Sequence, residues 1–452
     1  MVSRFFERIV IMLNFDARAL ALLNRLNENG YEAFLVGGCV RDALRNVEIH
    51  DYDVTTSALP QETLACFPDC PVIETGIRHG TVTVLWEGLP VEVTTYRVDG
   101  GYSDGRHPDG VRFTPSLEED LARRDFTVNA MAFSPLRGFC DPFGGRVDLE
   151  AGILRCVGDP SRRFSEDSLR ILRGLRFSSV TGFSLEFQTK SALIALREGL
   201  QKVSAERIRE EFVKLICGTH AEAILREFPQ VIGVFLPEIL PTVGFDQRNY
   251  HHCHTLYEHT LAVLSAVPPL PHLRLAALLH DVAKPETFSL DEGGTGHFYG
   301  HAQRSAERAD EILRRLRFDN ETRRAVVTLI RHHDGPLEES EGSVRRKLNK
   351  LGDLFFDYLA LCRADTLGLA PEFHGRISHF DRLEVLARKI LAENPCLREK
   401  DLAVNGHDLM LLGYRGPQIG AALRRLLDAV LDGAVENEKE LLLQYLNRED
   451  ET

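Results

Sequence analysis

The stretch Leu35-Val36-Gly37-Gly38-Cys39-Val40-Arg41-Asp42 reads as a short β-strand that enters a double-glycine turn and continues into a helix. Glycines in such a turn let backbone N–H groups approach an anion, and the dipole of the following helix favours negative charge there. The same pattern also fits a simple tight turn. Its meaning therefore depends on the residues that follow it.

Two aspartates follow, in the segment His50-Asp51-Tyr52-Asp53-Val54. On a strand, residues i and i+2 point to the same face, so the two carboxylates repel each other unless a cation lies between them. Mg²⁺, which prefers oxygen ligands and phosphates, is the expected occupant and would serve phosphoryl transfer. Glu92, in an alternating strand pattern, is either a third carboxylate for the same metal or an edge-strand surface residue.

A third segment, Arg123-Arg124-Asp125-Phe126-Thr127-Val128-Asn129-Ala130, combines two guanidinium groups with a carboxylate and an amide. Arginine can bind a triphosphate through paired hydrogen bonds, and an aspartate can accept from ribose hydroxyls. Taken alone, the segment is equally compatible with a salt-bridged entry into a strand.

In their order, these three segments resemble the superfamily of class II tRNA nucleotidyltransferases and bacterial poly(A) polymerases. The resemblance continues through Glu166-Asp167-x-x-Arg170 and Ser204-x-Glu206-Arg207-Ile208-x-x-Glu210. It implies an α+β fold, with a polymerase-β-like nucleotidyltransferase head of mixed sheet and helices followed by an all-helical remainder. It also implies that Asp51 and Asp53 are catalytic and bind Mg²⁺, and we take Glu92, from its strand pattern, as the third catalytic candidate. The expected nucleotide-binding residues are Gly37, Gly38, Arg41, Arg124, Asp125, Asn129, Glu166, Asp167, Arg170 and Arg173.

Choice of the incoming base is expected from the segment 166–170, which we predict to be helical. Asp167 and Arg170 are three residues apart and would share a helix face, where they could also form a simple ion pair. A carboxylate accepts from the exocyclic amine of cytosine or adenine, and a guanidinium donates to ring acceptors, whereas guanine and uracil present carbonyls instead of the amine. The resemblance implies that Asp167 and Arg170 act as a protein template, supported by Glu166 and Arg173.

Within the superfamily, two segments favour an enzyme that adds CCA to tRNA from CTP and ATP. Residues 74–82 resemble the CCA-adding branch, and the glycine-rich segment 101–109 resembles a loop that accompanies addition of the terminal A. An enzyme that adds only A, and a poly(A) polymerase, remain alternatives.

A histidine-rich middle contains the string Leu278-Leu279-His280-Asp281-Val282-Ala283-Lys284-Pro285, which resembles the HD phosphohydrolase superfamily. Adjacent histidine and aspartate ligands after an apolar helix suit an octahedral site for Mn, Ni, Mg or Fe. From the resemblance we expect the ligands His259, His280 and Asp281, together with His301, His332 or His333, and Asp334 or Asp365. Phosphatase or cyclic phosphodiesterase activity is implied. A protein of another class, an HD phosphohydrolase whose head only binds RNA, is the alternative.

The sequence patterns together predict four parts. We predict a head over 1–160, a helical neck over 161–242, an HD-type domain over 243–370 and a helical tail over 371–452 that contacts tRNA.

Composition limits the expected partners and location. A net charge of −13 requires any RNA contact to be local, and DNA is not an expected partner. The nine cysteines form no CxxC pair, and the apolar run Ile9–Leu13 is too short for a signal peptide or a membrane span, so we expect a cytoplasmic protein without membrane contact.

Overall fold

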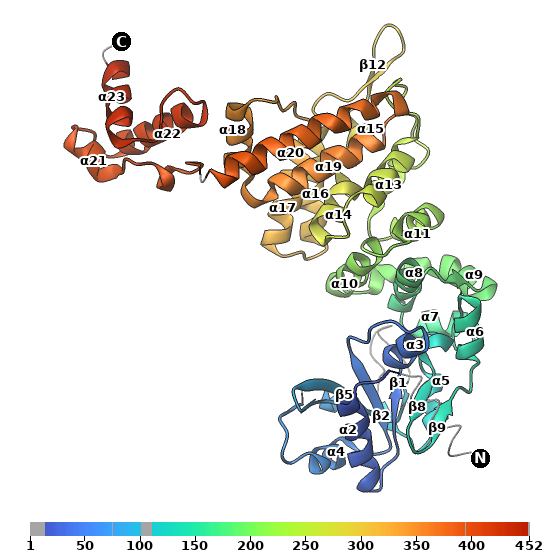
Figure 1. Cartoon of the computed structure of the whole chain (residues 1–452). Coiled ribbons are helices and arrows are strands. Elements are labelled where there is room, and N and C mark those ends of the chain that lie inside the picture. Colours follow the sequence, from blue (N-terminus) through green and yellow to red (C-terminus); the bar gives the residue numbers. More distant parts are fainter. Residues whose placement is uncertain (1–13, 75, 101–110, 394, 451–452) are drawn as a thin grey trace. The chain divides into compact units, whose positions relative to one another are not determined.

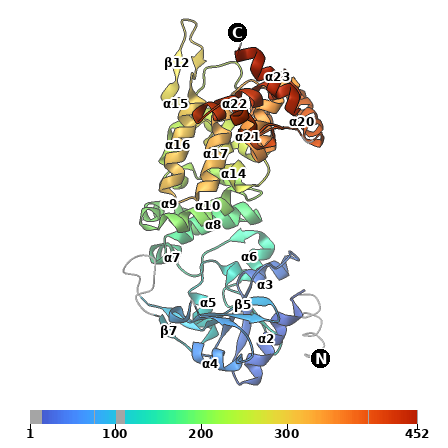
Figure 2. The ribbon, with the colours of Figure 1, turned by 90° about the vertical axis from the view of Figure 1, so that its left-hand side faces the viewer.

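The computed structural model describes residues 14–74, 76–100, 111–393 and 395–450. The chain divides into two compact units, Met1–Ile224 and Leu225–Thr452, and each is described by itself (Figures 1 and 2). The division falls inside the segment predicted as a single neck domain. The four-part organisation inferred from the sequence stays a prediction.

A seven-stranded mixed sheet forms the centre of the first unit, in the order β3-β4-β5-β2-β1-β8-β9. β2 and β5 are parallel, and the other neighbouring strands are antiparallel. The strands are β1 (Ala33–Val36), β2 (Tyr52–Thr56), β3 (Val72–Ile73), β4 (Thr81–Trp86), β5 (Leu89–Thr95), β8 (Ala132–Ser134) and β9 (Gly138–Cys140). The α+β head expected from the sequence is confirmed, including a short strand before the double-glycine turn.

β1 is buried on both of its sides, so other parts of the head cover both faces of the sheet at this strand. Its residues Ala33 and Leu35 pack into a core with α2 (Ala17–Glu28), whereas Phe34 and Val36 join a second core with Leu121 of α5 (Leu117–Ala122). Since side chains alternate along a strand, this one segment ties two layers to the sheet. Smaller elements of the head are α3 (Gly38–Leu44), α4 (Pro60–Cys66), α6 (Gly145–Ala151), the pair β6 (Arg97–Asp99) and β7 (Val111–Phe113), and the 3₁₀ turns η1 (Ile77–His79) and η2 (Thr127–Asn129).

Beyond the sheet the first unit is mostly helical. Its helices are α7 (Pro160–Glu166), α8 (Leu169–Thr181), α9 (Phe187–Ala195), η3 (Arg197–Lys202), α10 (Ala205–Ile216) and the start of α11 (Ala221–Glu227), with a short parallel pair of β10 (Ile153–Leu154) and β11 (Ser184–Leu185). Asp159 caps α7 and Pro160 occupies its first turn, which is a typical start signal.

The prediction of a continuous helix over residues 166–170 is wrong. α7 ends at Glu166, Asp167 has an extended backbone with φ −140°, and α8 begins at Leu169. The side chain of Asp167 accepts a hydrogen bond from Leu169 N at 3.1 Å. This local bond satisfies a free amide at the start of α8, so the aspartate interrupts the helix rather than extending it.

The second unit is built almost entirely of helices, as predicted for the chain after residue 160. A bundle of α13 (Leu256–Ala266), α14 (Pro271–Leu279), α16 (His301–Arg315), α17 (Asn320–His332) and α19 (Phe355–Leu367) forms its centre (Figure 1). Around it lie α12 (Pro229–Ile232), η4 (Pro237–Thr242), α15 (Lys284–Thr287), α18 (Glu341–Leu351), η5 (Gly352–Leu354), η6 (Pro371–Arg376), α20 (Ile377–Ala392) and a hairpin of β12 (Ser289–Leu290) and β13 (Gly296–His297).

The tail has a hydrophobic core of its own, formed by residues from Cys396 to Leu446. It contains η7 (Glu399–Asp401), α21 (Gly406–Leu411), α22 (Pro417–Leu431) and α23 (Lys439–Asp450). No helix in the described ranges is long and apolar enough to cross a membrane.

Candidate functional site

Three carboxylates gather where β2 and β5 run side by side. Asp53 on β2 is the register partner of Glu92 on β5, and side chains of paired residues in parallel strands lie on the same face. Asp51 directly precedes β2 and is exposed. Burial raises the pKa of Asp53 to about 6, with Arg124 opposing and the charges of Glu92 and Asp51 adding to the rise. A carboxyl group disfavoured by burial and by like charges is a place that a divalent cation fits.

The double-glycine turn lies against this group. Gly37 has a φ of +75°, which favours glycine, and a Cβ atom there would lie 3.2 Å from Arg124 Nη1 and 3.5 Å from Asp53 Oδ2. The turn, the carboxylate and the guanidinium therefore meet in one place. Asp120 holds Arg124 from behind, with 3.4 Å between Arg124 Nη2 and Asp120 Oδ2.

A chain of polar contacts continues from the turn towards the helices. Arg41 Nη1 donates to Asn129 Oδ1 at 2.7 Å, and Asn129 Nδ2 donates to Asp125 Oδ1 at 3.1 Å. Arg173 of α8 pairs with Asp125 at 2.7 Å. Burial would raise the pKa of Asp125, but Arg173 and Asn129 outweigh it and hold the pKa well below its usual range. Asp125 is therefore a buried, ionised acceptor.

Asp167 and Arg170, which are predicted to select the incoming base, have separate partners. Arg170 pairs with Glu166 at 2.9 Å and donates to Arg123 O at 3.1 Å. Asp167 instead pairs with Arg207 of α10 at 2.8 Å. The carboxylate of Asp167 and the guanidinium of Arg170 are thus held by Arg207 and Glu166, respectively, on either side of the helix break.

Sequence reasoning missed three residues that hold this region. Asp120 is fully buried and pairs with Arg123 and Arg124, at spacings of three and four residues that the sequence could have revealed. Arg207 is part of a family motif to which the sequence assigned no role, and it forms an ion pair with Asp167. Glu211 pairs with Arg176 at 2.6 Å and with Arg173 at 3.5 Å, from 35 and 38 residues away, and no local signal marks it.

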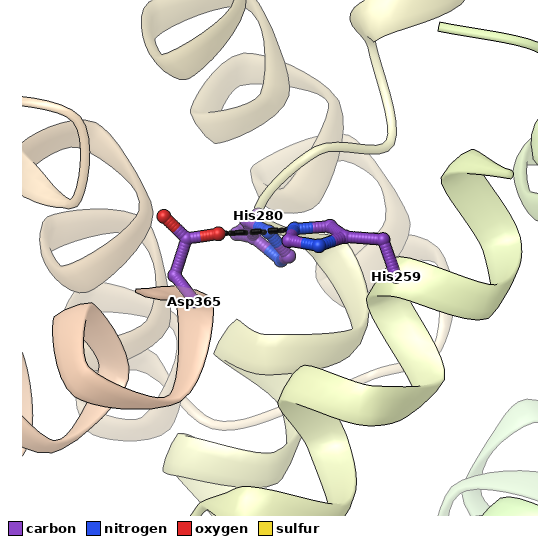
Figure 3. A group of neighbouring side chains, drawn as sticks. All are labelled: His259, His280 and Asp365. Carbon is purple, nitrogen blue, oxygen red and sulfur yellow. Dashed lines mark hydrogen bonds and ion pairs between the residues drawn. The ribbon is translucent and has the colours of Figure 1, made fainter. Parts of the chain in front are cut away.

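A second cluster lies inside the helical unit, where side chains from α13, α19 and the residue after α14 converge (Figure 3). His259 Nε2 lies 3.0 Å from Asp365 Oδ1, and His280 Nε2 lies 3.4 Å from His259 Nε2. On the other side, Asp281 Oδ1 lies 3.3 Å from His301 Nε2 and 3.6 Å from His333 Nε2. Asp281 Oδ2 lies 3.2 Å from His280 Nε2. We call these six residues the histidine cluster.

All four histidines of the cluster are oriented in the same way by backbone carbonyls. The Nδ1 atoms of His259, His280, His301 and His333 lie 2.7–3.0 Å from the carbonyl oxygens of Gly368, Ala277, Phe298 and Ile330, respectively. Because a carbonyl only accepts, each Nδ1 carries a proton and each Nε2 points inward, where its lone pair is free for a metal whenever the ring is neutral. Orientation of Nε2 through Nδ1 is the usual arrangement of metal-binding histidines.

The cluster also fits a metal by its charge. Both carboxylate oxygens of Asp281 are buried, and within the described residues neither accepts a hydrogen bond of good geometry. The ammonium group of Lys284 lies 2.6 Å from Oδ2 and forms an ion pair with it. Burial would lower the pKa of His280, but Asp281 and Asp365 outweigh it and raise the pKa to about 10. A bound cation would replace the positive charge that these carboxylates otherwise draw onto an imidazole.

The structure distinguishes between the alternative metal ligands predicted from the sequence. His333 lies in the histidine cluster, whereas the predicted ligand His332 is not part of it. Burial, together with the positive charges of Lys350, Lys347 and Arg331, lowers the pKa of His332 to about 4. Asp365 contacts His259, whereas Asp334 is exposed and reaches only His301 Nδ1, at 3.8 Å. The predicted loop at 101–109 and Thr75 lie outside the described residues.

Three family models match the chain. Residues 33–155 match "Poly A polymerase head domain", residues 182–231 match "Probable RNA and SrmB- binding site of polymerase A", and residues 297–446 match "tRNA nucleotidyltransferase domain 2 putative".

Relatives match over nearly the whole chain. The CCA-adding enzyme of Anoxybacillus flavithermus is 34% identical over 433 residues, which are 95% of this chain and 96% of that enzyme. The CCA-adding enzyme of Geobacillus thermodenitrificans is 49% identical over 221 residues, 49% of this chain and 54% of that enzyme. Among solved structures, the Bacillus stearothermophilus CCA-adding enzyme in complex with CTP is 30% identical, with a TM-score of 0.69 over 96% of this chain and 98% of that chain. The Thermotoga maritima CCA-adding enzyme complexed with tRNA, at 19% identity and a TM-score of 0.60 over 98% of both chains, shares the fold.

Proposed function

This chain belongs to the family of CCA-adding enzymes, and we propose that it adds C, C and A from CTP and ATP to the 3′ end of tRNA and repairs incomplete ends. The tRNA 3′ oxygen bonds to the α-phosphorus of the nucleotide, the bond to the β-phosphate breaks, and pyrophosphate leaves. One observation carries the proposal. Asp53, two residues after Asp51, is paired in register with Glu92, and its carboxylate lies beside the Gly37 turn.

The residues of the head fit distinct tasks in this reaction. Asp51 and Asp53, with Glu92 beside them, would hold Mg²⁺, which supplies positive charge for attack on the phosphate. The guanidinium groups of Arg41 and Arg124 lie beside the Gly37–Gly38 turn, where they would bind the triphosphate. Asp125 offers an ionised acceptor for a ribose hydroxyl. Asp167, held by Arg207, and Arg170, held by Glu166, would read the base edge. We place the reaction in the cytoplasm, in keeping with nine free cysteines.

An assay with tRNA lacking CCA tests this function and separates its close alternatives. The wild-type protein should add C from CTP alone and complete CCA when ATP is also present. Extension by A alone would identify an A-adding enzyme, and long A tracts would identify a poly(A) polymerase. Asp51→Ala should abolish every product. Transfer at the wild-type rate by that variant would contradict the proposed site.

A second activity is supported by the histidine cluster. Four inward-pointing Nε2 atoms, deprotonated on metal binding, and the carboxylates of Asp281 and Asp365 would hold divalent ions of the octahedral class, Mn, Ni, Mg or Fe. Such ions activate water for hydrolysis of phosphate esters. We therefore propose a phosphohydrolase activity in the unit 225–452. His280→Ala should remove the metal and the hydrolysis of phosphate esters together, and wild-type turnover in that variant would exclude the cluster as the hydrolytic site.

A further inference from the structure

An exposed group of aromatic and cationic side chains adjoins the histidine cluster. The rings of Tyr250 and His251 lie tilted against each other with centroids 4.0 Å apart, and the His251 ring meets Phe373 edge to face at 4.5 Å between centroids. The guanidinium of Arg376 lies 5.0 Å from the centre of the Phe373 ring. Tyr250 is 72% exposed, so most of its ring is open to a ligand. We call these four residues the aromatic platform.

Backbone contacts join the aromatic platform to the metal-binding residues. Ala370 N donates to His251 O at 2.9 Å, and two residues before Ala370 the carbonyl of Gly368 accepts from His259 Nδ1. The platform therefore adjoins the side of the cluster formed by His259.

A buried polar atom lies between the two. The ring of His252, next to the platform, packs edge to face on His259 with centroids 5.3 Å apart. Its Nδ1 atom is buried and has no hydrogen-bond partner in the described part of the chain. Buried polar atoms of native proteins normally have a partner. This atom is positioned to bond a group that enters with a ligand.

We propose that the aromatic platform binds an unpaired nucleobase, so that the terminal phosphate of a single-stranded RNA end is directed to the histidine cluster. Every base has a flat face that stacks on aromatic rings and on guanidinium planes, which makes such platforms tolerant of sequence. Arg376 adds positive charge beside the platform, the local attraction that a chain of net charge −13 needs for RNA. This assignment rests on the proposed phosphohydrolase function, and it names the substrate class of that site.

Photo-crosslinking tests the platform without relying on hydrolysis. The probe is a short unstructured oligoribonucleotide with a 3′-phosphate and 5-iodocytidine as its last base, incubated with the full chain in EDTA. After irradiation, peptide mapping should find a crosslink at Tyr250, His251 or Phe373. Tyr250→Ala should reduce that crosslink on the order of tenfold, and Tyr250→Phe should retain it. The control is Tyr299→Ala, because Tyr299 is 78% exposed and stacks on His297 of the hairpin. That variant should match wild type.

Crosslinks confined to residues 1–224, or unchanged in Tyr250→Ala, would overturn the proposal. With metal restored, a kinetic comparison adds a second test. Tyr250→Ala should raise KM for a nucleoside monophosphate on the order of tenfold and leave hydrolysis of glycerol 2-phosphate, which has no base, unchanged. An equal loss with both substrates would contradict a base-binding role. Absence of hydrolysis of either substrate by the wild-type protein contradicts the phosphohydrolase function alone, because the crosslink still decides whether the platform binds a base.

Discussion

At the scale of single residues, the head holds a carboxylate in a place where the fold itself disfavours its charge. Asp53 is partly buried beside Glu92 and Asp51, and its pKa is raised to about 6. Such a residue lowers the stability of the metal-free protein at neutral pH, since its charged form is better solvated in the unfolded chain. The Mg²⁺ ion proposed for this site would offset that cost.

Asp53→Asn should therefore separate stability from activity. The neutral amide removes the repulsion and should increase the free energy of unfolding of the metal-free protein at pH 7, by on the order of 2 kcal/mol. Nucleotide transfer to tRNA should fall at least about a hundredfold. Denaturation in EDTA and a transfer assay measure the two effects, with the exposed acid Glu118→Gln as the control. A destabilised Asp53→Asn protein would contradict this description of the site.

Base choice belongs to the same scale because it depends on how one carboxylate is held. Asp167→Ala should allow G and U to be incorporated while slowing addition of C and A less, because it removes the acceptor for the exocyclic amine. Arg207→Ala should have the same effect in weaker form, since Arg207 pairs with Asp167. Arg209→Ala, on the same helix, serves as the control. Incorporation of all four nucleotides is compared, and unchanged selectivity in Asp167→Ala would contradict the assignment.

At the scale of elements, a buried carboxylate joins α5 to the sheet. Asp120 Oδ2 accepts from Thr55 Oγ1 of β2 at 3.0 Å, and Oδ1 pairs with Arg123 at 2.8 Å. Burial would raise its pKa, but Arg123 and Arg124 outweigh it and lower the pKa. A carboxyl group with a lowered folded pKa stabilises the fold above its unfolded pKa of about 3.9. That stability is lost as the pH falls through the folded value.

Asp120→Asn should consequently cost about 3 kcal/mol of unfolding free energy at pH 7. The difference from wild type should narrow as the pH falls below 4, because the wild-type carboxyl then becomes protonated. Denaturation curves at a series of pH values measure both proteins. A constant difference down to pH 2 would show that the charge of Asp120 does not provide the stabilisation.

The end of α17 provides a matched pair of variants for the histidine cluster. His333 Nε2 lies 3.6 Å from Asp281 Oδ1, whereas burial and the positive charges of Lys350 and Lys347 lower the pKa of the neighbouring His332. His333→Ala should lower bound metal and metal-dependent phosphate ester hydrolysis by about ten- to a hundredfold, and His332→Ala should change neither by more than about twofold. Elemental analysis of the purified proteins and a hydrolysis assay provide the measurements. The reverse order of effects would mean that His332 is the ligand.

These elements also show what the sequence can and cannot predict. The strand-turn-helix pattern at Leu35–Asp42 predicted β1 and α3 because it depends on local geometry. A common face for Asp51 and Asp53 stays a prediction, since Asp51 precedes the first residue of β2. The break at Asp167 was missed because its side chain competes with the helix for one amide, which spacing does not reveal. His332 and His333 lie at the end of α17, where the exact last helical residue decides which ring points to Asp281, and the sequence does not fix that residue. Arg207 is 40 residues from Asp167, so only the folded chain brings them together.

At the scale of the whole molecule, two compact units carry two separate sets of reactive groups. The carboxylates of the head and the histidine cluster lie in different units, 1–224 and 225–452. Each set is complete within its own unit. Loss of one should therefore leave the chemistry of the other intact.

Extension of tRNA lacking its CCA end is the measurement that tests the central claim, that the carboxylates on β2 and β5 carry nucleotide transfer. With CTP and ATP, the wild-type and His280→Ala proteins should both complete the CCA end at similar rates. Asp53→Asn, although folded, should leave the tRNA unextended. Full extension by Asp53→Asn, or loss of extension in His280→Ala with Asp53 intact, would contradict the account.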